Sequence, residues 1–178
     1  LAMWEIAYDM GFCLGRMDQY LYPFFESDMR EGRSTREEAQ ELLDCYMVKV
    51  GHAGASASMA VGGVGPDGND ACNDLSYILL EAVMHTQLAG PNIAALIHSK
   101  SPDQFLIKAC QLTSLGGGHP QFLNYDVMVA QALARGTTGG PSVTLRDART
   151  AANVGCLELV IPGKDSGYLY FSHYSNHA

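Results

Sequence analysis

The chain has 178 residues, 47% of them hydrophobic and 17% charged, with a formal net charge of −8 and a pI near 5.1. This composition is ordinary for a globular protein, and no run of Lys or Arg supplies the clustered cations that bind a nucleic-acid backbone. No apolar stretch approaches the roughly 20 residues that a membrane-spanning helix needs, so the sequence predicts neither a nucleic-acid partner nor a membrane anchor.

The N-terminal segment, from Leu1 to about Pro23, is predicted to form one helix. Aromatic residues and glycines recur in it at helical spacing, and the proline would end it. Arg16 and Asp18 are expected to be a buried or half-buried structural pair, so no catalytic role is assigned to them.

A second helix is predicted after the capping box Ser34–Glu37, with the apolar residues of 39–50 on one face. The small residues of 51–65 predict a tightly packed strand, and the glycine-rich segment 62–68 predicts a turn. The glycine spacing fits neither a phosphate loop nor a dinucleotide fingerprint, so the turn is interpreted as structural.

The segment 70–89 predicts a further helix, on which Glu81 and His85 are four residues apart and could pair. The apolar run 91–98 follows a proline and predicts a buried strand that ends in His98. A metal site would need more ligands than this pair provides, and none is expected.

The second half of the chain continues the alternation of helices and short strands. Ser101-Pro102-Asp103 begins a helix, and residues 119–124 predict a short buried strand whose last residue, Asn124, caps the helix running to Arg135. Thr144 to Asp147 caps a brief helix that ends near Asn153. The whole pattern predicts an α/β fold with no linker between independent domains.

The segment 153–158 places a thiol, Cys156, two residues before a carboxylate, Glu158, with Gly155 just ahead of the thiol. In an extended segment these two side chains would point to the same face and could address one substrate together. Two other interpretations remain open. Most single cysteines beside an apolar residue are core thiols. A thiol hydrolase would instead need a histidine partner, and the chain has 6 histidines.

The five cysteines are an odd number and are widely spaced, which fits neither a disulfide framework nor a zinc site. A reducing cytoplasm is therefore the expected setting. They are Cys13, Cys45, Cys72, Cys110 and Cys156.

Several motifs follow one another in an order that resembles the pyruvate formate-lyase-like superfamily of glycyl radical enzymes. The resemblance extends over nearly the whole chain, and its cysteine motif falls on Gly155-Cys156-Leu157-Glu158. The motifs are Gly15–Phe24, Gly62–Asp70, Asn73–Tyr77, Pro91-Asn92, and Gly118–Pro120 with Asn124.

The resemblance implies a fold and a domain organisation. Residues 1–178 would be part of an α/β barrel of ten strands, built from two five-stranded halves with helices outside and the cysteine loop inside. The chain would be an internal fragment of a longer protein. It contains no Arg-Val-x-Gly-Tyr motif, so the C-terminal glycyl radical domain is expected to lie outside it.

The resemblance also implies a radical mechanism in the parent protein. Cys156 would become a thiyl radical that takes hydrogen from a small hydroxylated substrate, and Glu158 would be the general base for elimination by dehydration or C–N or C–S cleavage. The glycyl radical would be installed by a radical-SAM activating enzyme, and the full-length protein is expected to be an oxygen-sensitive, cytoplasmic homodimer.

Alternatives within the resemblance are an arylacetate-type decarboxylase, a formate acetyltransferase and a non-catalytic relative without a radical glycine. Pyruvate formate-lyase proper has two adjacent cysteines, whereas residue 155 here is Gly, which argues against pyruvate as substrate. His98, Phe122 and Leu123 are predicted to border the substrate cavity, although a core role for His98 is the competing interpretation.

Overall fold

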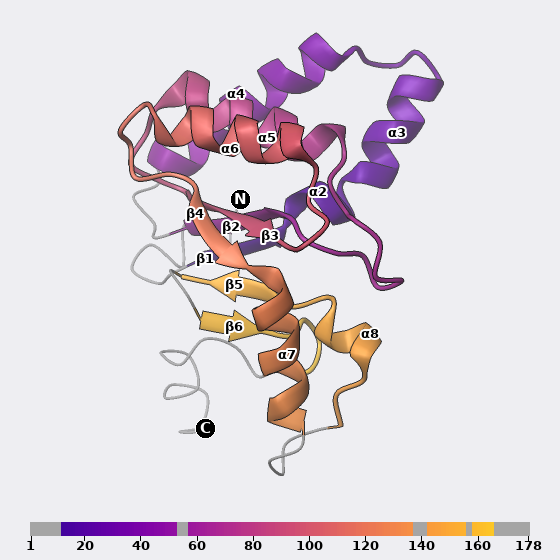
Figure 1. The fold of residues 1–178 in the computed structure, drawn as a ribbon. Coiled ribbons are helices and arrows are strands. Elements are labelled where there is room, and N and C mark those ends of the chain that lie inside the picture. The colour runs from indigo at the N-terminus through magenta and orange to yellow at the C-terminus, as the bar shows by residue number, and fades with distance from the viewer. Residues whose placement is uncertain (1–11, 53–56, 137–141, 156–157, 166–178) are drawn as a thin grey trace, which may run out of the picture.

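The computed structural model describes residues 12–52, 57–136, 142–155 and 158–165. A parallel sheet lies at the centre, with helices on one side and a β-hairpin with two further helices on the other (Figure 1). In chain order the elements are β1 (Phe12–Arg16), α2 (Met17–Tyr20), α3 (Tyr22–Arg30), α4 (Arg36–His52), β2 (Ala57–Gly62), α5 (Asp74–Thr86), β3 (Asn92–Ile97), α6 (Asp103–Thr113), β4 (Gln121–Asn124), α7 (Tyr125–Gly136), α8 (Leu145–Ala148), β5 (Ala152–Val154) and β6 (Glu158–Val160).

The four strands of the sheet are parallel and stand in chain order, β1-β2-β3-β4. Parallel neighbours need a crossover connection, and helices supply it between β1 and β2, β2 and β3, and β3 and β4. All four strands therefore end at the same edge of the sheet. This confirms the predicted α/β class, while the ten-stranded barrel remains a prediction.

One face of the sheet, here called the helix face, carries Met59 and Val61 of β2 and Ile93 and Ala95 of β3. These side chains pack with α4, α5 and α6 in an apolar core that includes Phe105, which is fully buried. Every residue of β2 is buried, as expected of a parallel strand covered on both sides.

The opposite face, here called the hairpin face, carries Ser58 and Ala60 of β2 and Ala94 and Leu96 of β3. The last three pack with Leu159 of β6 and with residues of α7 and α8. Because side chains alternate between faces along a strand, the small residues at 58, 60 and 94 leave room for backbone to approach closely.

Side chains at the helix starts determine where several elements begin. In α4 the reciprocal bonds join Thr35 and Glu38, one residue later than the predicted capping box. Asn73 and Ser76 form such a box at α5, and Thr144 and Asp147 form one at α8. Asn124 accepts the Val127 N–H at 3.1 Å, which confirms its predicted cap at α7.

Several local predictions are wrong. The helix that begins after Thr144 ends at Ala148 rather than near Asn153, which lies in β5. Residues 12–16 form a strand rather than part of a helix, because they pair in parallel with β2; residues 1–11 lie outside the described residues. Glu81 does not pair with His85. It instead accepts hydrogen bonds from Arg36 and Lys108 of the neighbouring helices, each with an N–O distance of 2.7 to 2.8 Å.

None of the helices within the described ranges is long and apolar enough to cross a membrane.

Candidate active site

The segment that carries the predicted thiol and carboxylate forms an antiparallel hairpin. Ala152 pairs with Val160, and Val154 pairs with Glu158, so the chain reverses direction between β5 and β6. Cys156 and Leu157 lie outside the described residues, and the role of Cys156 stays a prediction. Glu158 is the first residue of β6 and is exposed.

The segment 153–158 is not one extended strand. β5 ends at Val154, Gly155 has a left-handed backbone with φ of 58°, and a second strand starts at Glu158. Only glycine adopts such a φ without a steric cost, which explains the residue type at 155. Whether the thiol and the carboxylate lie together therefore depends on the turn rather than on strand periodicity.

The hairpin lies against β1 and β2 of the sheet and is bonded to both. The Cys13 thiol donates to the Asn153 carbonyl oxygen at 3.2 Å, and the Gly155 N–H donates to the Ser58 hydroxyl oxygen at 3.1 Å. Ser58 is 1% exposed, so its hydroxyl is a fixed acceptor inside the protein. The residue immediately before Cys156 is thus anchored to the hairpin face.

The base of the hairpin is held at the carboxyl ends of the strands. The Arg16 guanidinium and the Tyr125 hydroxyl both bond the Arg149 carbonyl oxygen, at 3.1 and 2.9 Å, just before β5 begins. β5 therefore runs from the carboxyl ends of β1 and β2 back toward their amino ends. Sequence reasoning did not find Ser58 or Tyr125; a lone hydroxyl in the otherwise apolar strand 57–62 was the available signal for Ser58.

A cavity of about 490 Å³ lies between the hairpin and the edge of the sheet. Leu14 and Gln19 line it from β1 and α2, and Ala152, Val154 and Val160 line it from the hairpin. Its walls are mostly apolar side chains, as is typical of small-molecule sites, and it is open to solvent on one side.

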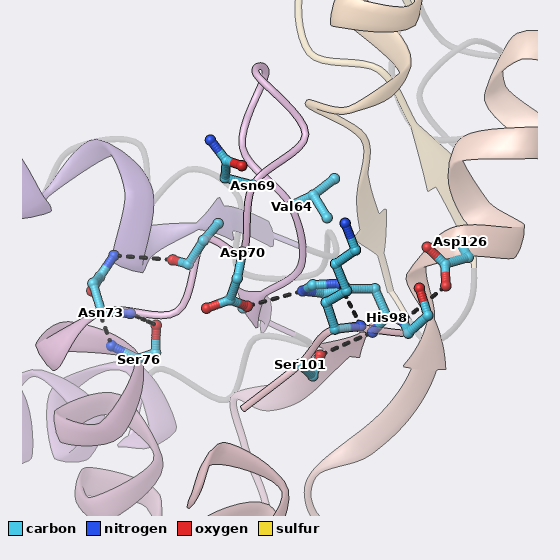
Figure 2. Close-up of polar contacts among 12 residues, drawn as sticks. Val64, Asn69, Asp70, Asn73, Ser76, His98, Ser101 and Asp126 are labelled. Atoms are coloured by element: carbon cyan, nitrogen blue, oxygen red, sulfur yellow. Dashed lines mark hydrogen bonds and ion pairs between the residues drawn. The ribbon is translucent and has the colours of Figure 1, made fainter. Parts of the chain in front are cut away.

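His98 lies just after β3 and is part of a separate polar network at the carboxyl ends of the strands (Figure 2). Its Nε2 is 2.9 Å from Asp70 Oδ1, and its Nδ1 accepts the Lys100 N–H at 3.2 Å. Because Nδ1 is an acceptor, the ring proton resides on Nε2 and is donated to the Asp70 carboxylate. The side chain is only 2% exposed, and this arrangement ties β3 to the loop before α5.

The structure does not bring His98 together with the tip of the hairpin. Ser58, which bonds Gly155, is level with Asn92 in the sheet, and His98 is six residues further along, or about 20 Å at strand rise. Of the other two predicted residues, Leu123 packs on the hairpin face, near its carboxyl edge. Phe122 is 45% exposed and pairs with Ala95, whose side chain is on the helix face.

Arg16 and Asp18 are both buried, as predicted, but each bonds other groups rather than its presumed partner. Asp18 Oδ2 accepts the Gly62 N–H at 2.7 Å and the Ser76 hydroxyl at 2.6 Å. Burial raises the pKa of Asp18 above its usual value, and these hydrogen bonds and the nearby Arg16 oppose that rise. The carboxyl group joins α2, β2 and the start of α5.

Within the part of the chain that the structure describes, no group of His, Cys, Asp and Glu side chains could hold a metal ion.

The pyruvate formate lyase-like family model matches residues 1–178, that is, the whole chain. Trans-4-hydroxy-L-proline dehydratase of Clostridioides difficile is 34% identical over 172 residues, with 88% of this chain and 21% of the relative covered. The chain therefore belongs to the pyruvate formate lyase-like family of glycyl radical enzymes.

Two solved structures share the fold. A structure from Roseburia inulinivorans, described for 1,2-propanediol dehydration, has a TM-score of 0.79 and 34% identity. The glycerol-bound B12-independent glycerol dehydratase of Clostridium butyricum has a TM-score of 0.77 and 36% identity. Each alignment covers 86% of this chain and 20% of the other, so the chain spans about a fifth of the length of the proteins it matches.

Proposed function

We propose that this chain is part of the catalytic barrel of a glycyl radical lyase that eliminates water or another leaving group from a small hydroxylated substrate. The observation that supports it best is the hairpin, which holds the two ends of the Cys156 segment on the hairpin face of a family-matched parallel sheet. In the parent, residues 1–178 would belong to the ten-stranded barrel, and the glycyl radical would lie on another domain.

The described part of the hairpin suits this role. The N–H of Gly155 is anchored by a buried hydroxyl, so the neighbouring thiol can be held at one position between the radical and the substrate. The glycyl radical, when present, supplies one reaction: it takes the hydrogen atom of the Cys156 thiol. Cys156 then accepts a hydrogen atom from a substrate carbon, which re-forms its S–H bond and leaves the unpaired electron on that carbon.

Glu158 would accept the proton of the hydroxyl on that carbon. The leaving group on the neighbouring carbon departs with its bonding electron pair, and in a dehydration it takes the proton from Glu158 to leave as water. The product radical takes back the hydrogen atom of Cys156, and the sulfur would recover a hydrogen atom from the parent's radical glycine. Transfer of this proton requires a carboxylate close to the hydroxyl. Glu158 is two residues from the thiol in the chain, and its side chain, which is exposed in this chain, would be enclosed by the rest of the parent's barrel.

Dehydration is the first choice because a hydroxyproline dehydratase and a glycerol dehydratase are among the relatives, which also include isethionate sulfite-lyases and a 4-hydroxyphenylacetate decarboxylase. C–N or C–S cleavage uses the same residues with a different leaving group. Decarboxylation, formate transfer and a non-catalytic role are the alternatives, and Gly155 argues against formate transfer because it replaces one of the two adjacent cysteines. The proposal includes a radical-SAM activating enzyme as partner, a homodimeric parent and an anaerobic cytoplasmic setting.

The test uses the full-length parent, activated without oxygen and assayed with glycerol, 1,2-propanediol and trans-4-hydroxy-L-proline. We expect Cys156→Ala to abolish turnover, and Glu158→Gln to reduce it by about a hundredfold or more while the glycyl radical still forms. Cys45→Ala, which changes an exposed thiol on α4, is the matched control and should retain activity. Substantial turnover by the Cys156→Ala parent would overturn the proposal.

A further inference from the structure

Two buried side chains hold the chain at the point where it enters the hairpin. The Tyr125 hydroxyl oxygen is 2.7 Å from the Ala151 carbonyl oxygen and 2.9 Å from that of Arg149. A hydroxyl has one proton to donate, so Tyr125 serves these two carbonyls in turn, with the closer one favoured. Both carbonyls belong to the three residues between α8 and β5.

Arg16 completes this attachment. Its guanidinium donates to the Tyr125 hydroxyl at 3.0 Å and to the Arg149 carbonyl at 3.1 Å, and its carbon lies 5.2 Å from the centroid of the Tyr125 ring. It also donates to the carbonyls of Gly62 and Val64, at 2.6 and 2.9 Å. The base of the hairpin is thereby bonded to the ends of β1 and β2 and to the start of α7.

The surrounding chain is shaped for this pair. Arg16 is 8% exposed and Tyr125 is fully buried. A Cβ at Gly63 would come within 3.1 Å of the Tyr125 ring and 3.3 Å of the guanidinium, and the φ of Gly63 is 80°. A buried guanidinium is costly unless its donors are satisfied. Here the two terminal nitrogens donate to carbonyls of residues 62–64 and of Arg149 and to the Tyr125 hydroxyl, while Nε has no hydrogen-bond partner among the described residues.

We infer that Arg16 and Tyr125 are positioning residues for the Cys156 thiol, an inference that rests on the proposed function. Ala151 lies three residues before Val154, where β5 ends, or about 10 Å at strand rise, so a small rotation at the base is enlarged along the strand toward Gly155. Hydrogen transfer needs reacting atoms about 3–3.5 Å apart, and a misplacement of about 1 Å can cost a hundredfold in rate. The hydrogen bond from Gly155 to Ser58 holds the far end of β5 at one point. The Arg16–Tyr125 pair holds the other end, and the two attachments together define the direction in which β5 runs.

The test uses Tyr125→Phe in the full-length parent, which removes the hydroxyl and keeps the buried ring. Arg16→Lys is the second variant, because it keeps the charge and loses the planar fork. Tyr22→Phe, on α3 against Phe25, is the matched control. The radical-free proteins are compared by amide hydrogen exchange, which needs no activity.

We expect Tyr125→Phe to raise exchange in the hairpin peptides while leaving that of α4 and α5 unchanged. In the activated protein, kcat per glycyl radical should fall about tenfold or more, with KM within about twofold of the unmodified parent. In D2O the thiol carries deuterium. When a deuterium atom moves from the thiol to the glycine and the glycine's hydrogen atom returns to the sulfur, the re-formed glycyl radical lacks the α-hydrogen splitting of its EPR spectrum. That loss should slow by a factor similar to kcat.

Unchanged hairpin exchange and unchanged kcat in both variants would overturn the inference, as would a loss of thermal stability alone. If the unmodified parent shows no Cys156-dependent turnover, the proposed function fails instead. The Cys156→Ala parent, assayed alongside, separates these two failures.

Discussion

The two faces of the parallel sheet are covered in different ways. The helix face is packed by large apolar side chains from α4, α5 and α6, whereas the hairpin face has small residues and a few buried polar bonds. Apolar packing is non-directional and tolerates small shifts, but a hydrogen bond defines the position of a particular backbone atom. We conclude that packing on the helix face provides most of the folding stability. The hydrogen bonds on the hairpin face fix the position of the hairpin backbone.

The largest effect is expected from Phe105→Ala on the helix face. Phe105 is fully buried and packs edge-on against Tyr77. Its replacement by alanine leaves a cavity and should lower the free energy of unfolding by about 3–5 kcal/mol. We expect a large drop in the thermal unfolding temperature of the parent, measured by differential scanning fluorimetry. Phe24→Ala, which changes a side chain that is 71% exposed, is the control. An equal drop in both variants would contradict the division between the two faces.

Ala60→Leu adds volume on the hairpin face, where Ala60 is fully buried in the cluster that includes Leu159. Overpacking of this kind costs about 1–3 kcal/mol. The displaced element should be the hairpin, because the other side of β2 is fully packed. We expect turnover to fall by more than the stability loss explains, with increased amide exchange in the hairpin but not in α5. Loss of protection in α5 first would show that the two faces are not separable.

Ser58→Ala removes the acceptor for the Gly155 N–H. Loss of this hydrogen bond should lower the free energy of unfolding by about 0.5–1.5 kcal/mol. We expect kcat to fall several-fold while KM and the unfolding temperature change little, because the bond positions the residue next to the thiol. Ser114→Ala removes an exposed hydroxyl that bonds the Gln111 carbonyl at the end of α6, and should have no effect on kcat. Equal kcat values in the two variants would argue that the tip is positioned by other contacts.

The smallest effect is expected in the pH dependence of stability, from Asp18, whose carboxyl group bonds Gly62 at the end of β2 and Ser76 of α5. Burial raises the pKa of Asp18 above 3.8, so the folded state retains a proton that the unfolded state releases. Its contribution to stability is present below pH 3.8 and is lost as the pH rises through the folded-state pKa. Asp18→Asn should remove this component, so the unfolding temperature of the variant relative to the parent should rise with pH over that interval.

Asp147→Asn is the control, because the pKa of Asp147 is shifted in the opposite direction from that of Asp18. The hydrogen bonds of Thr144 and Lys164 lower the pKa of Asp147 to about 2, so its contribution is present above pH 3.8 and is lost as the pH falls toward 2. Slopes of the same sign for the two variants would contradict the assignment at Asp18.

Local signals in the sequence predicted much of the fold. The strand of small residues before Gly62, the apolar strand predicted over 91–98 and the cap at Asn124 are all present, although the apolar strand ends at Ile97 rather than at His98. Each depends on a short-range preference that acts within a few residues. The strand at 12–16 could not be predicted in this way, because it exists through pairing with β2, more than forty residues away.

In the candidate site too, some features could be predicted from the sequence and others are found only in the structure. The order of the motifs identified the family, and the segment 153–158 indicated the thiol and the carboxylate. Neither pattern contains the chain reversal between Val154 and Glu158, the Ser58 contact with Gly155, or the distance of His98 from that tip.

The sequence by itself therefore determined the family, the α/β class and the residues to which the chemistry is assigned, because these depend on residue type, order and local spacing. Only the tertiary structure decided what holds the hairpin. Arg16, Ser58 and Tyr125 come from separate strands and a helix, and they meet the hairpin only when the parallel strands align. Their contacts join residues between 24 and 133 positions apart in the chain, a separation over which no local preference acts.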